Sequence, residues 1–293
     1  MREPLPPVLE PAVVERAVAA ALAEDLGWGD VTTEALVPRE QQGRGVFLVK
    51  GSGVVCGLSV AEAVFRQVDP RLRFQPMLPE GSPVERGALA AHVEGSMASI
   101  LKAERTALNF LQRLSGVASE TAAYVAAVDG LPVRIIDTRK TTPGLRALEK
   151  YAVRVGGGHN HRAHLGDGVL VKDNHLAALN SRGLTLADAV ALARARAPHT
   201  LRVEVEVTSL AQAQEATAAG ADLLLLDNMT PEAMRAVAEW TRVLPGPRPL
   251  LEASGGVRLE TVRAVAETGV DLISVGALTH SARALDISLE VEG

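Results

Sequence analysis

The sequence has few of the residues that several classes of protein require. Cys56 is the only cysteine among 293 residues, which excludes an internal disulfide and a cysteine-rich zinc site. Aromatic residues make up 3% of the chain and no tail is rich in lysine or arginine, so nucleic acid is not an expected partner. What remains is the composition of a globular protein suited to a reducing compartment.

Long hydrophobic runs are also missing. Leu223–Leu226 is among the longest, whereas a membrane-spanning helix needs about 20 apolar residues. The first ten residues contain prolines and acidic residues but no apolar stretch typical of a signal peptide. We therefore expect a cytoplasmic protein with no membrane partner.

Charge is distributed unevenly along the chain. The net charge is −5, yet residues 134–173 contain eight basic and four acidic side chains. Such a local excess of positive charge attracts an anionic ligand. Part of it, Arg146, Lys150 and Arg154, fits the solvated face of a helix instead.

The first part of the chain predicts helices packed on a sheet. Pro11–Leu26 has apolar residues at helical spacing and is followed by Gly27. Residues 43–94 contain short β-rich runs broken by glycine and proline, with a helix expected at Ala61–Gln67. A longer helix is predicted from Ser96 to Leu114, ended by Gly116.

Strands then alternate regularly with amphipathic helices. The predicted strands are Val133–Asp137, Gly168–Lys172, Arg202–Val207, Ala221–Asp227, Pro249–Ser254 and Val270–Gly276. Thr185 with Asp188 has the spacing of a capping box, and Thr230-Pro231 is typical of a helix start. This alternation predicts a parallel α/β barrel. Leu285–Val291 alternates with period two and is expected to be an edge strand that returns to the N-terminal sheet.

Each predicted barrel strand is apolar until its end, where polar or small residues follow. These ends read Asp137–Thr141, Lys172–His175, Glu204–Glu206, Asp227–Asn228, Ser254–Gly256 and Gly276–Ala277. Because the carboxyl ends of parallel barrel strands meet at one rim, we expect a binding site there. Asp173 and Asn228 could instead only cap the helices that follow them.

The expected rim has groups of three kinds. The cationic group is Arg139, Lys140, His161, Arg162 and Lys172, and the anionic group is Glu206 and Asp227. Two glycine-containing ends supply backbone N–H groups suited to phosphate, namely Ser254, Gly255 and Gly256, and Gly276, Ala277 and Leu278. The ligand is therefore expected to carry carboxylates, phosphates and either hydroxyls or a metal ion.

Other interpretations of the same residues stay open. Lys172 at a strand end could form a Schiff base, as in aldolases. The run Gly156–His164 contains three histidines and could bind a metal, although Arg162 beside His161 would repel a cation.

Nine stretches share motifs with one enzyme family. They are Glu24–Thr33, Glu104–Asn109, Thr138–Arg146, Gly156–Arg162, Val171–His175, Glu204–Glu206, Leu226–Asn228, Glu252–Gly256 and Val275–His280. Together they resemble quinolinate phosphoribosyltransferase, also called nicotinate-nucleotide pyrophosphorylase (carboxylating). The resemblance extends over nearly the whole chain from about residue 10.

The resemblance implies an α/β fold in two domains. An N-terminal α/β sandwich would comprise residues 1–114 and 280–293, and an open, TIM-like α/β barrel would comprise residues 115–279. The implied substrates are quinolinate and phosphoribosyl pyrophosphate (PRPP) with Mg²⁺. The implied products are nicotinate mononucleotide, pyrophosphate and CO₂, in NAD synthesis.

The resemblance also implies roles for individual residues. The cationic group would hold the two quinolinate carboxylates together with Arg105 of a neighbouring subunit in a homo-oligomer, and Thr138 is a further expected substrate-binding residue. Glu206 and Asp227 would stabilise the ribose, and the two glycine-containing ends would bind its 5′-phosphate. Lys140, Glu206 and Asp227 are the expected catalytic residues, with Lys140 a candidate for protonating the ring carbon. No protein side chain is expected to ligate a metal directly, because Mg²⁺ would travel with PRPP and Glu206 and Asp227 would reach it only indirectly.

Three rivals to this function remain at the sequence level. A nicotinate phosphoribosyltransferase would bind one carboxylate and release no CO₂. A non-catalytic barrel would sense or store a carboxylated metabolite, and a lyase would use Lys172 as a Schiff base. The purine-salvage type of phosphoribosyltransferase is disfavoured, since Leu223–Met229 lacks the second acidic residue and the Thr-Gly loop of that type.

Overall fold

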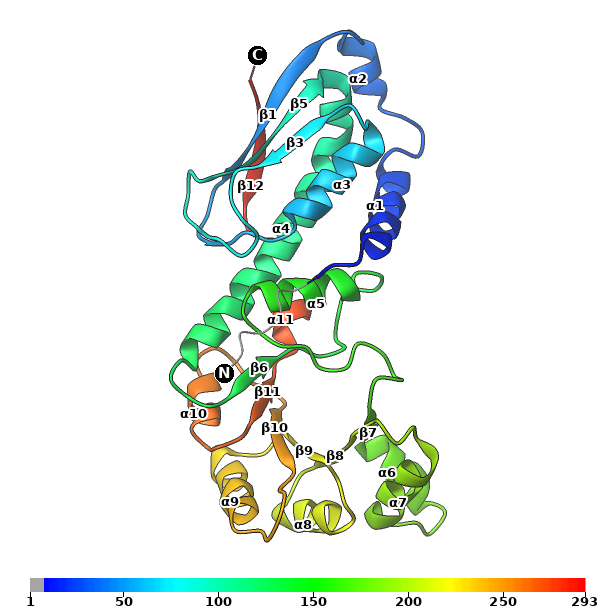
Figure 1. Ribbon diagram of the computed structural model, residues 1–293, viewed down its shortest axis with the longest axis vertical. Helices are drawn as coiled ribbons and strands as arrows, with labels where there is room; N and C mark the ends of the chain where they lie inside the picture. Colours follow the sequence, from blue (N-terminus) through cyan, green and yellow to red (C-terminus); the bar gives the residue numbers. More distant parts are fainter. Residues whose placement is uncertain (1–7, 293) are drawn as a thin grey trace. The chain divides into compact units, whose positions relative to one another are not determined.

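The computed structural model describes residues 8–292, which divide into two compact units (Figure 1). The first unit contains the described residues up to Ala122, Thr141–Gly157 and the chain from Leu278 onward. The second contains Ala123–Lys140 and Gly158–Ala277. The domains expected from the sequence assign residues 141–157 to the barrel, whereas in the structure these residues make their contacts within the first unit.

The first unit is built on an antiparallel sheet with the strand order β12-β1-β5-β3. Its elements are α1 (Pro11–Asp25), α2 (Val31–Leu36), β1 (Gln42–Val49), β2 (Gly53–Val54), α3 (Leu58–Val68), β3 (Arg73–Pro76), β4 (Pro83–Val84), β5 (Leu89–Ser96), α5 (Arg146–Val155) and β12 (Ile287–Glu292). The predicted return of the C-terminal tail is confirmed, because β12 pairs antiparallel with β1 at the edge of the sheet.

Three phenylalanines join the sheet to the helix that covers it. Phe47 of β1, Phe65 of α3 and Phe74 of β3 contact one another, with ring centroids 5.7 or 5.8 Å apart. Such pairs contribute about 0.5–1.5 kcal/mol each beyond the apolar area they bury. Helix α1 packs beside α3, as Figure 1 shows.

Helix α4 (Met97–Ala127) is longer than the sequence predicts. The prediction that Gly116 ends this helix is wrong, because Gly116 lies inside it and serves close packing. A Cβ atom placed there would lie 2.1 Å from the carbonyl oxygen of Arg283. The backbone of the C-terminal segment therefore approaches the helix at a distance that only glycine permits.

The second unit contains a six-stranded sheet in which every strand pair is parallel, in the order β6-β11-β10-β9-β8-β7. Its elements are β6 (Arg134–Ile136), β7 (Val169–Val171), α6 (Asp173–Asn180), α7 (Leu186–Arg196), β8 (Val203–Val207), α8 (Leu210–Ala218), β9 (Leu223–Asp227), α9 (Pro231–Arg242), β10 (Leu250–Ser254), α10 (Val262–Ala266) and β11 (Leu272–Ser274). The six predicted strands and the open α/β barrel are thus confirmed, and α11 (Ala277–His280) follows the last strand.

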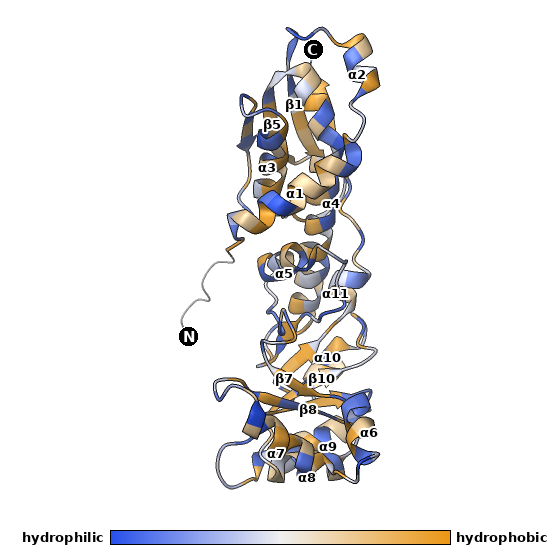
Figure 2. Ribbon diagram, turned by 90° about the vertical axis from the view of Figure 1, so that its right-hand side faces the viewer, coloured by the Kyte–Doolittle hydropathy of each residue, from blue (hydrophilic) through white to orange (hydrophobic). Residues whose placement is uncertain are grey.

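The local sequence explains where the helices of this unit begin. Thr185 and Asp188 form the predicted capping box at α7, and the Thr230 side chain caps α9, whose first residue is Pro231. In Figure 2 the strands are mostly apolar, while α8 and α9 each carry polar and apolar residues. Helices of this kind bury one face against the sheet and leave the other in water.

One expectation about a helix surface is wrong. Lys150 was expected on a solvated face of its helix, but α5 buries it to 5% exposure within the first unit, beside the fully buried Glu149. Glu149 accepts hydrogen bonds from Arg113 and from the backbone and hydroxyl of Thr142. The face of α5 that carries these charges therefore packs inward, where Glu149 is paired with Arg113.

Within residues 8–292, no helix combines the length and the apolar character that crossing a membrane requires.

The close approach at Gly116 can be tested by stability measurements. Gly116→Ala is expected to lower the free energy of unfolding by about 1–3 kcal/mol, because overpacking outweighs the better helix propensity of alanine. Urea denaturation followed by circular dichroism measures the change. Gly166→Ala is the matched control, since a Cβ atom there meets nothing within 4 Å. Equal midpoints for the two variants would contradict the packing account.

Candidate active site

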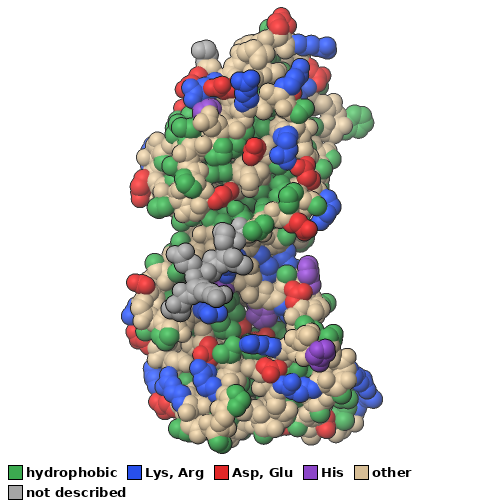
Figure 3. Space-filling view, viewed as in Figure 1, with side chains coloured by type: hydrophobic (Ala, Val, Ile, Leu, Met, Phe, Trp, Pro, Cys, Tyr) green, Lys and Arg blue, Asp and Glu red, His purple; other side chains and the backbone are tan. Residues whose placement is uncertain are grey.

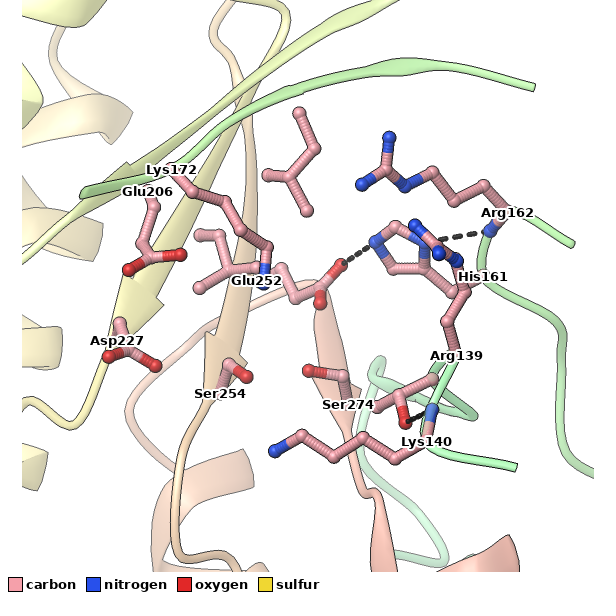
Figure 4. Close-up of a pocket in the computed structure, with 13 residues that line it drawn as sticks. Arg139, Lys140, His161, Arg162, Lys172, Glu206, Asp227, Glu252, Ser254 and Ser274 are labelled. Carbon is pink, nitrogen blue, oxygen red and sulfur yellow. Dashed lines mark hydrogen bonds and ion pairs between the residues drawn. The ribbon is translucent and has the colours of Figure 1, made fainter. Parts of the chain in front are cut away.

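A cavity of about 170 Å³ lies at the carboxyl edge of the parallel sheet in the second unit (Figure 4). It is lined by Thr138, Arg139, Lys140, His161, Arg162, Leu170, Lys172, Glu206, Leu225, Asp227, Glu252, Ser254 and Ser274. Asp227, Ser254 and Ser274 are the last residues of β9, β10 and β11, and Lys172 follows β7 directly. The structure therefore brings nine of the predicted site residues together at one rim.

One side of the cavity is cationic. The Arg162 guanidinium is held by a hydrogen bond of 2.9 Å from Nη1 to the carbonyl oxygen of Gly168. Partial burial and then the nearby charge of Arg139 lower the pKa of Arg162 from its ordinary value. Two guanidinium groups thus stand close enough to repel each other, and an anion bound between them would relieve that repulsion.

The loop after β6 supplies the remaining residues of this side. The Lys140 backbone N–H donates a 3.0 Å hydrogen bond to Oγ1 of Thr138, which closes a short turn. In Figure 4 the Lys140 ammonium group extends along the cavity toward Ser254, while the Arg139 guanidinium group points toward His161. The two neighbouring cations therefore serve different parts of the cavity.

The opposite side of the cavity is anionic. Glu206 of β8 and Asp227 of β9 face each other there (Figure 4). Burial and then the charge of Asp227 raise the pKa of Glu206, while Lys172 opposes the shift. Figure 3 shows basic, acidic and histidine side chains close together on the visible face of this unit. Such a pair of carboxylates is suited to hydroxyl groups or to developing positive charge.

His161 and two buried glutamates form the floor of the cavity. Nδ1 of His161 accepts a 2.7 Å hydrogen bond from the Arg162 backbone N–H. Nε2 lies 3.2 Å from Oε2 of Glu204 and 3.6 Å from Oε2 of Glu252. Because Nδ1 accepts a hydrogen bond, the ring hydrogen is placed on Nε2, where it points at the two carboxylates. Both ring nitrogens are therefore engaged by the protein.

The same three residues are the group in the described part of the chain that could hold a metal, with ligand atoms within 4.8 Å of one another. The histidine geometry argues against that use. A metal ion at Nε2 would require the hydrogen to sit on Nδ1, where the Arg162 N–H already donates. The cluster is better suited to hydrogen bonding and proton sharing.

The loop carrying His161 is fixed by a fully buried carboxylate. Asp137, which follows β6, accepts a 2.8 Å hydrogen bond from the His161 backbone N–H and a 2.6 Å bond from Nδ2 of Asn160. An isolated bridge also pairs Ile136 with His159. These contacts attach the loop to the end of β6 and hold His161 and Arg162 at the cavity.

The predicted phosphate-binding ends lie partly outside the cavity lining. Ser254 lines it, whereas Gly255, Gly256, Gly276, Ala277 and Leu278 do not. Gly255 and Gly256 have positive φ angles of 92° and 62°, which glycine adopts without strain. The Leu278 side chain is fully buried, so only its backbone could contact a ligand. Arg105 lies exposed on α4 in the first unit, and its predicted role in a partner's site stays a prediction.

Sequence reasoning missed four residues that line the cavity. They are Leu170, Leu225, Glu252 and Ser274. One of them was within reach, because Glu252 shares a strand face with Ser254 under the two-residue period of a strand, as the nearby Glu204 does with Glu206. The inward glutamates could have been inferred from this alternation.

The repulsion between Glu206 and Asp227 gives a measurable effect. Asp227→Asn removes the neighbouring negative charge that opposes ionisation, so the pKa of Glu206 is expected to fall toward its ordinary value. Carbon NMR of the labelled glutamate carboxyl groups across a pH titration measures the shift. Glu239→Gln on the exposed face of α9 is the charge-matched control and should leave the Glu206 titration in place. An unchanged Glu206 pKa in Asp227→Asn would contradict the coupling.

Comparisons with known proteins place the whole chain in one family. Residues 30–115 match the quinolinate phosphoribosyl transferase N-terminal domain, and residues 117–290 match the C-terminal domain of the same family. The chain is 45% identical to the nicotinate-nucleotide pyrophosphorylase (carboxylating) of Mycobacterium leprae, with 94% of this chain and 95% of the relative covered. It is 42% identical to the probable enzyme of the same name from Bacillus subtilis, with 92% of this chain and 90% of the relative covered.

A solved structure gives the same result. The crystal structure of NadC from Streptococcus pyogenes superimposes with a TM-score of 0.91 at 42% identity, covering 97% of this chain and 98% of that one. Both domains, their order and the fold of the whole chain are therefore shared. The chain belongs to the quinolinate phosphoribosyltransferase family.

Proposed function

We propose that the chain transfers the phosphoribosyl group of PRPP to quinolinate with decarboxylation, giving nicotinate mononucleotide, pyrophosphate and CO₂ for NAD synthesis. The observation that carries this proposal is the separation of charge across one cavity. Arg139 and Arg162 stand on one side, and Glu206 and Asp227 stand on the other. A dicarboxylated ring fits the first side and a ribose fits the second, in a chain whose relatives are named for this chemistry.

The two guanidinium groups would bind the ring carboxylates, with Lys172 beside them. Guanidinium groups bind planar carboxylates through two parallel hydrogen bonds, and each charge-assisted contact contributes about 1.5–3 kcal/mol. Adjacent carboxylates repel each other, so several cations are needed to hold both. His161 is less suited to direct carboxylate binding, because its two nitrogens already face protein groups. Its ring would instead support this side of the cavity.

Glu206 and Asp227 would face the ribose. As the bond to pyrophosphate breaks, positive charge develops on the sugar, and nearby carboxylates stabilise it. The raised pKa of Glu206 beside Asp227 also fits a cation in this region, since a positive charge would relieve their repulsion. Neutralising the departing pyrophosphate is the chemistry that Mg²⁺ bound to PRPP supplies.

The remaining groups would position PRPP. The Lys140 ammonium group extends toward Ser254, where it can contact a phosphate oxygen (Figure 4). Ser254, the backbone N–H groups of Gly255 and Gly256, and those of residues 276–278 would bind the 5′-phosphate. The ring nitrogen is then held against the anomeric carbon, which removes much of the entropic barrier to their reaction.

Quaternisation of the ring nitrogen prepares the loss of CO₂. The electron pair of the broken carbon–carbon bond stays on the ring carbon beside the positive nitrogen, which stabilises it. A proton must then be supplied to that carbon.

A homodimer or larger assembly and a cytoplasmic location complete the proposal. Arg105 is exposed on α4, so its guanidinium group is available to a second copy of the chain. Another subunit's arginine would add positive charge to a site that must hold a dianion.

The reaction is tested by assaying quinolinate and nicotinate separately with PRPP and Mg²⁺. We expect quinolinate to be converted with CO₂ and pyrophosphate released in equal amounts, and nicotinate to be inert. Turnover of nicotinate without CO₂ would favour the nicotinate rival. No turnover with retained quinolinate binding would favour a sensor. Borohydride trapping of substrate on Lys172 would favour a lyase.

The proposed sharing of Arg105 predicts complementation between inactive variants. Arg105→Ala and Lys140→Ala are each expected to be inactive, but a mixed dimer would contain one site with neither change. Mixing equal amounts under exchanging conditions should restore roughly a quarter of wild-type activity, as random pairing in a two-fold dimer requires. Arg105→Ala mixed with itself is the control. Failure of the mixture to regain activity, with subunit exchange verified, would contradict the shared site.

A further inference from the structure

Glu252 is a buried acid that the proposed reaction has so far left without a role. It lies on β10, is 1% exposed and lines the cavity. Neither of its carboxyl oxygens has a hydrogen-bond partner among the described residues. In Figure 4 its carboxyl group lies between the end of Lys172 and the ring of His161, on the side of the cavity where Arg139 and Arg162 stand.

Its surroundings favour the neutral, protonated form. Burial and then the charge of Glu204 raise the pKa of Glu252 well above its ordinary value. Asp137 at the end of β6 acts in the same direction, and His161 contacts the group from the loop before β7. A proton on Glu252 also allows this wall to face a dianionic ring without repulsion. These surroundings therefore favour a carboxylic acid at Glu252 over a second carboxylate beside Glu204.

Glu252 also borders a second cavity. This cavity, of about 300 Å³, lies toward the amino ends of the strands and includes Arg134, Arg202 and Leu223 in its lining. The two cavities share Glu252, His161 and Arg162. Glu252, together with His161 and Arg162, therefore lies between the space for substrate and a second space at the amino ends of the strands.

We propose that Glu252 is the catalytic acid that delivers a proton to the ring carbon from which CO₂ departs. This inference rests on the proposed decarboxylating function. It assigns the one proton transfer that the reaction requires to the acid that stands among the carboxylate-binding cations.

The transfer balances in atoms and electrons. The bond between the ring carbon and its carboxylate breaks, CO₂ leaves, and the electron pair stays on the ring carbon. That pair takes the proton of the Glu252 carboxyl group, which forms a carbon–hydrogen bond and leaves Glu252 as a carboxylate. Water in the second cavity then returns a proton to Glu252, so one solvent proton is consumed for each turnover.

Lys140 is the competing donor, and its position is less favourable. Its ammonium group points toward Ser254, on the side assigned to the phosphate-bearing substrate (Figure 4). Glu252 lies beside the cations assigned to the ring carboxylates. The donor is needed where a carboxylate has just left, which is the side of Glu252.

The test uses the origin of the new hydrogen as its readout. Wild type and Glu252→Gln are assayed with quinolinate, PRPP and Mg²⁺ in an equal mixture of H₂O and D₂O. Proton NMR of the isolated nicotinate mononucleotide gives the ratio of hydrogen to deuterium at the new position. We expect Glu252→Gln to lower kcat about 100-fold or more, as loss of a catalytic acid does. Its residual product should have a different isotope ratio, because another donor then supplies the hydrogen.

Two further variants separate proton donation from structure. Glu204→Gln changes the carboxylate beside Glu252 but leaves Glu252 itself in place. This variant should therefore retain the wild-type isotope ratio, whatever its turnover rate. Glu252→Asp keeps a carboxylic acid and should also retain that ratio, which covers the case in which Glu252→Gln does not fold. An unchanged ratio in Glu252→Gln, or an unchanged kcat, would overturn the assignment. If wild type releases no CO₂ from quinolinate, the proposed function fails instead.

Discussion

Like charges held close together in one small cavity are the constraint on which the site depends. Arg139 stands close to Arg162, and Asp227 stands close to Glu206. After burial, the charge of that neighbour is the next cause that lowers the pKa of Arg162 and raises the pKa of Glu206. The protein holds Arg162 in place with a partly buried hydrogen bond to the carbonyl oxygen of Gly168. The folded protein holds these like charges close together, and their repulsion is relieved when a ligand group of opposite charge binds. The site is therefore organised for its ligand before the ligand arrives.

The parallel sheet makes this concentration of charge feasible. Because its six strands run in one direction, their carboxyl ends supply side chains to a single edge. Residues far apart in the chain, such as Lys140 and Ser254, then line one cavity of about 170 Å³. The barrel interior beneath them contains Glu204, Glu252 and His161. Apolar residues of similar volume at such buried positions often make a protein more stable than charged ones do. Polar groups retained at such a depth are better explained by the chemistry above them.

The sequence carries most of this information in two kinds of pattern. Alternating strands and helices predicted the barrel, and polar residues at the strand ends predicted the cavity. Both depend on local periodicity, which a chain shows directly. The role of Gly116 could not be read in this way, because it depends on a backbone segment more than 160 residues away. Lys150 was misjudged for a similar reason, since only the packing of α5 decides which of its faces is buried. The inward direction of Glu252 follows from the strand period, but its contact with His161 and its closeness to Glu204 join residues of other elements and could not be read from the sequence.

Recognition of two carboxylates by paired arginines is the central claim, and calorimetric titration with quinolinate tests it most directly. The account predicts that wild type binds quinolinate and that Arg162→Gln weakens this binding about 10-fold or more, since one charge-assisted pair is lost. Arg196→Gln, on the last turn of α7, removes the same charge away from the cavity and should bind quinolinate as wild type does. Equal affinities for all three proteins would contradict the account.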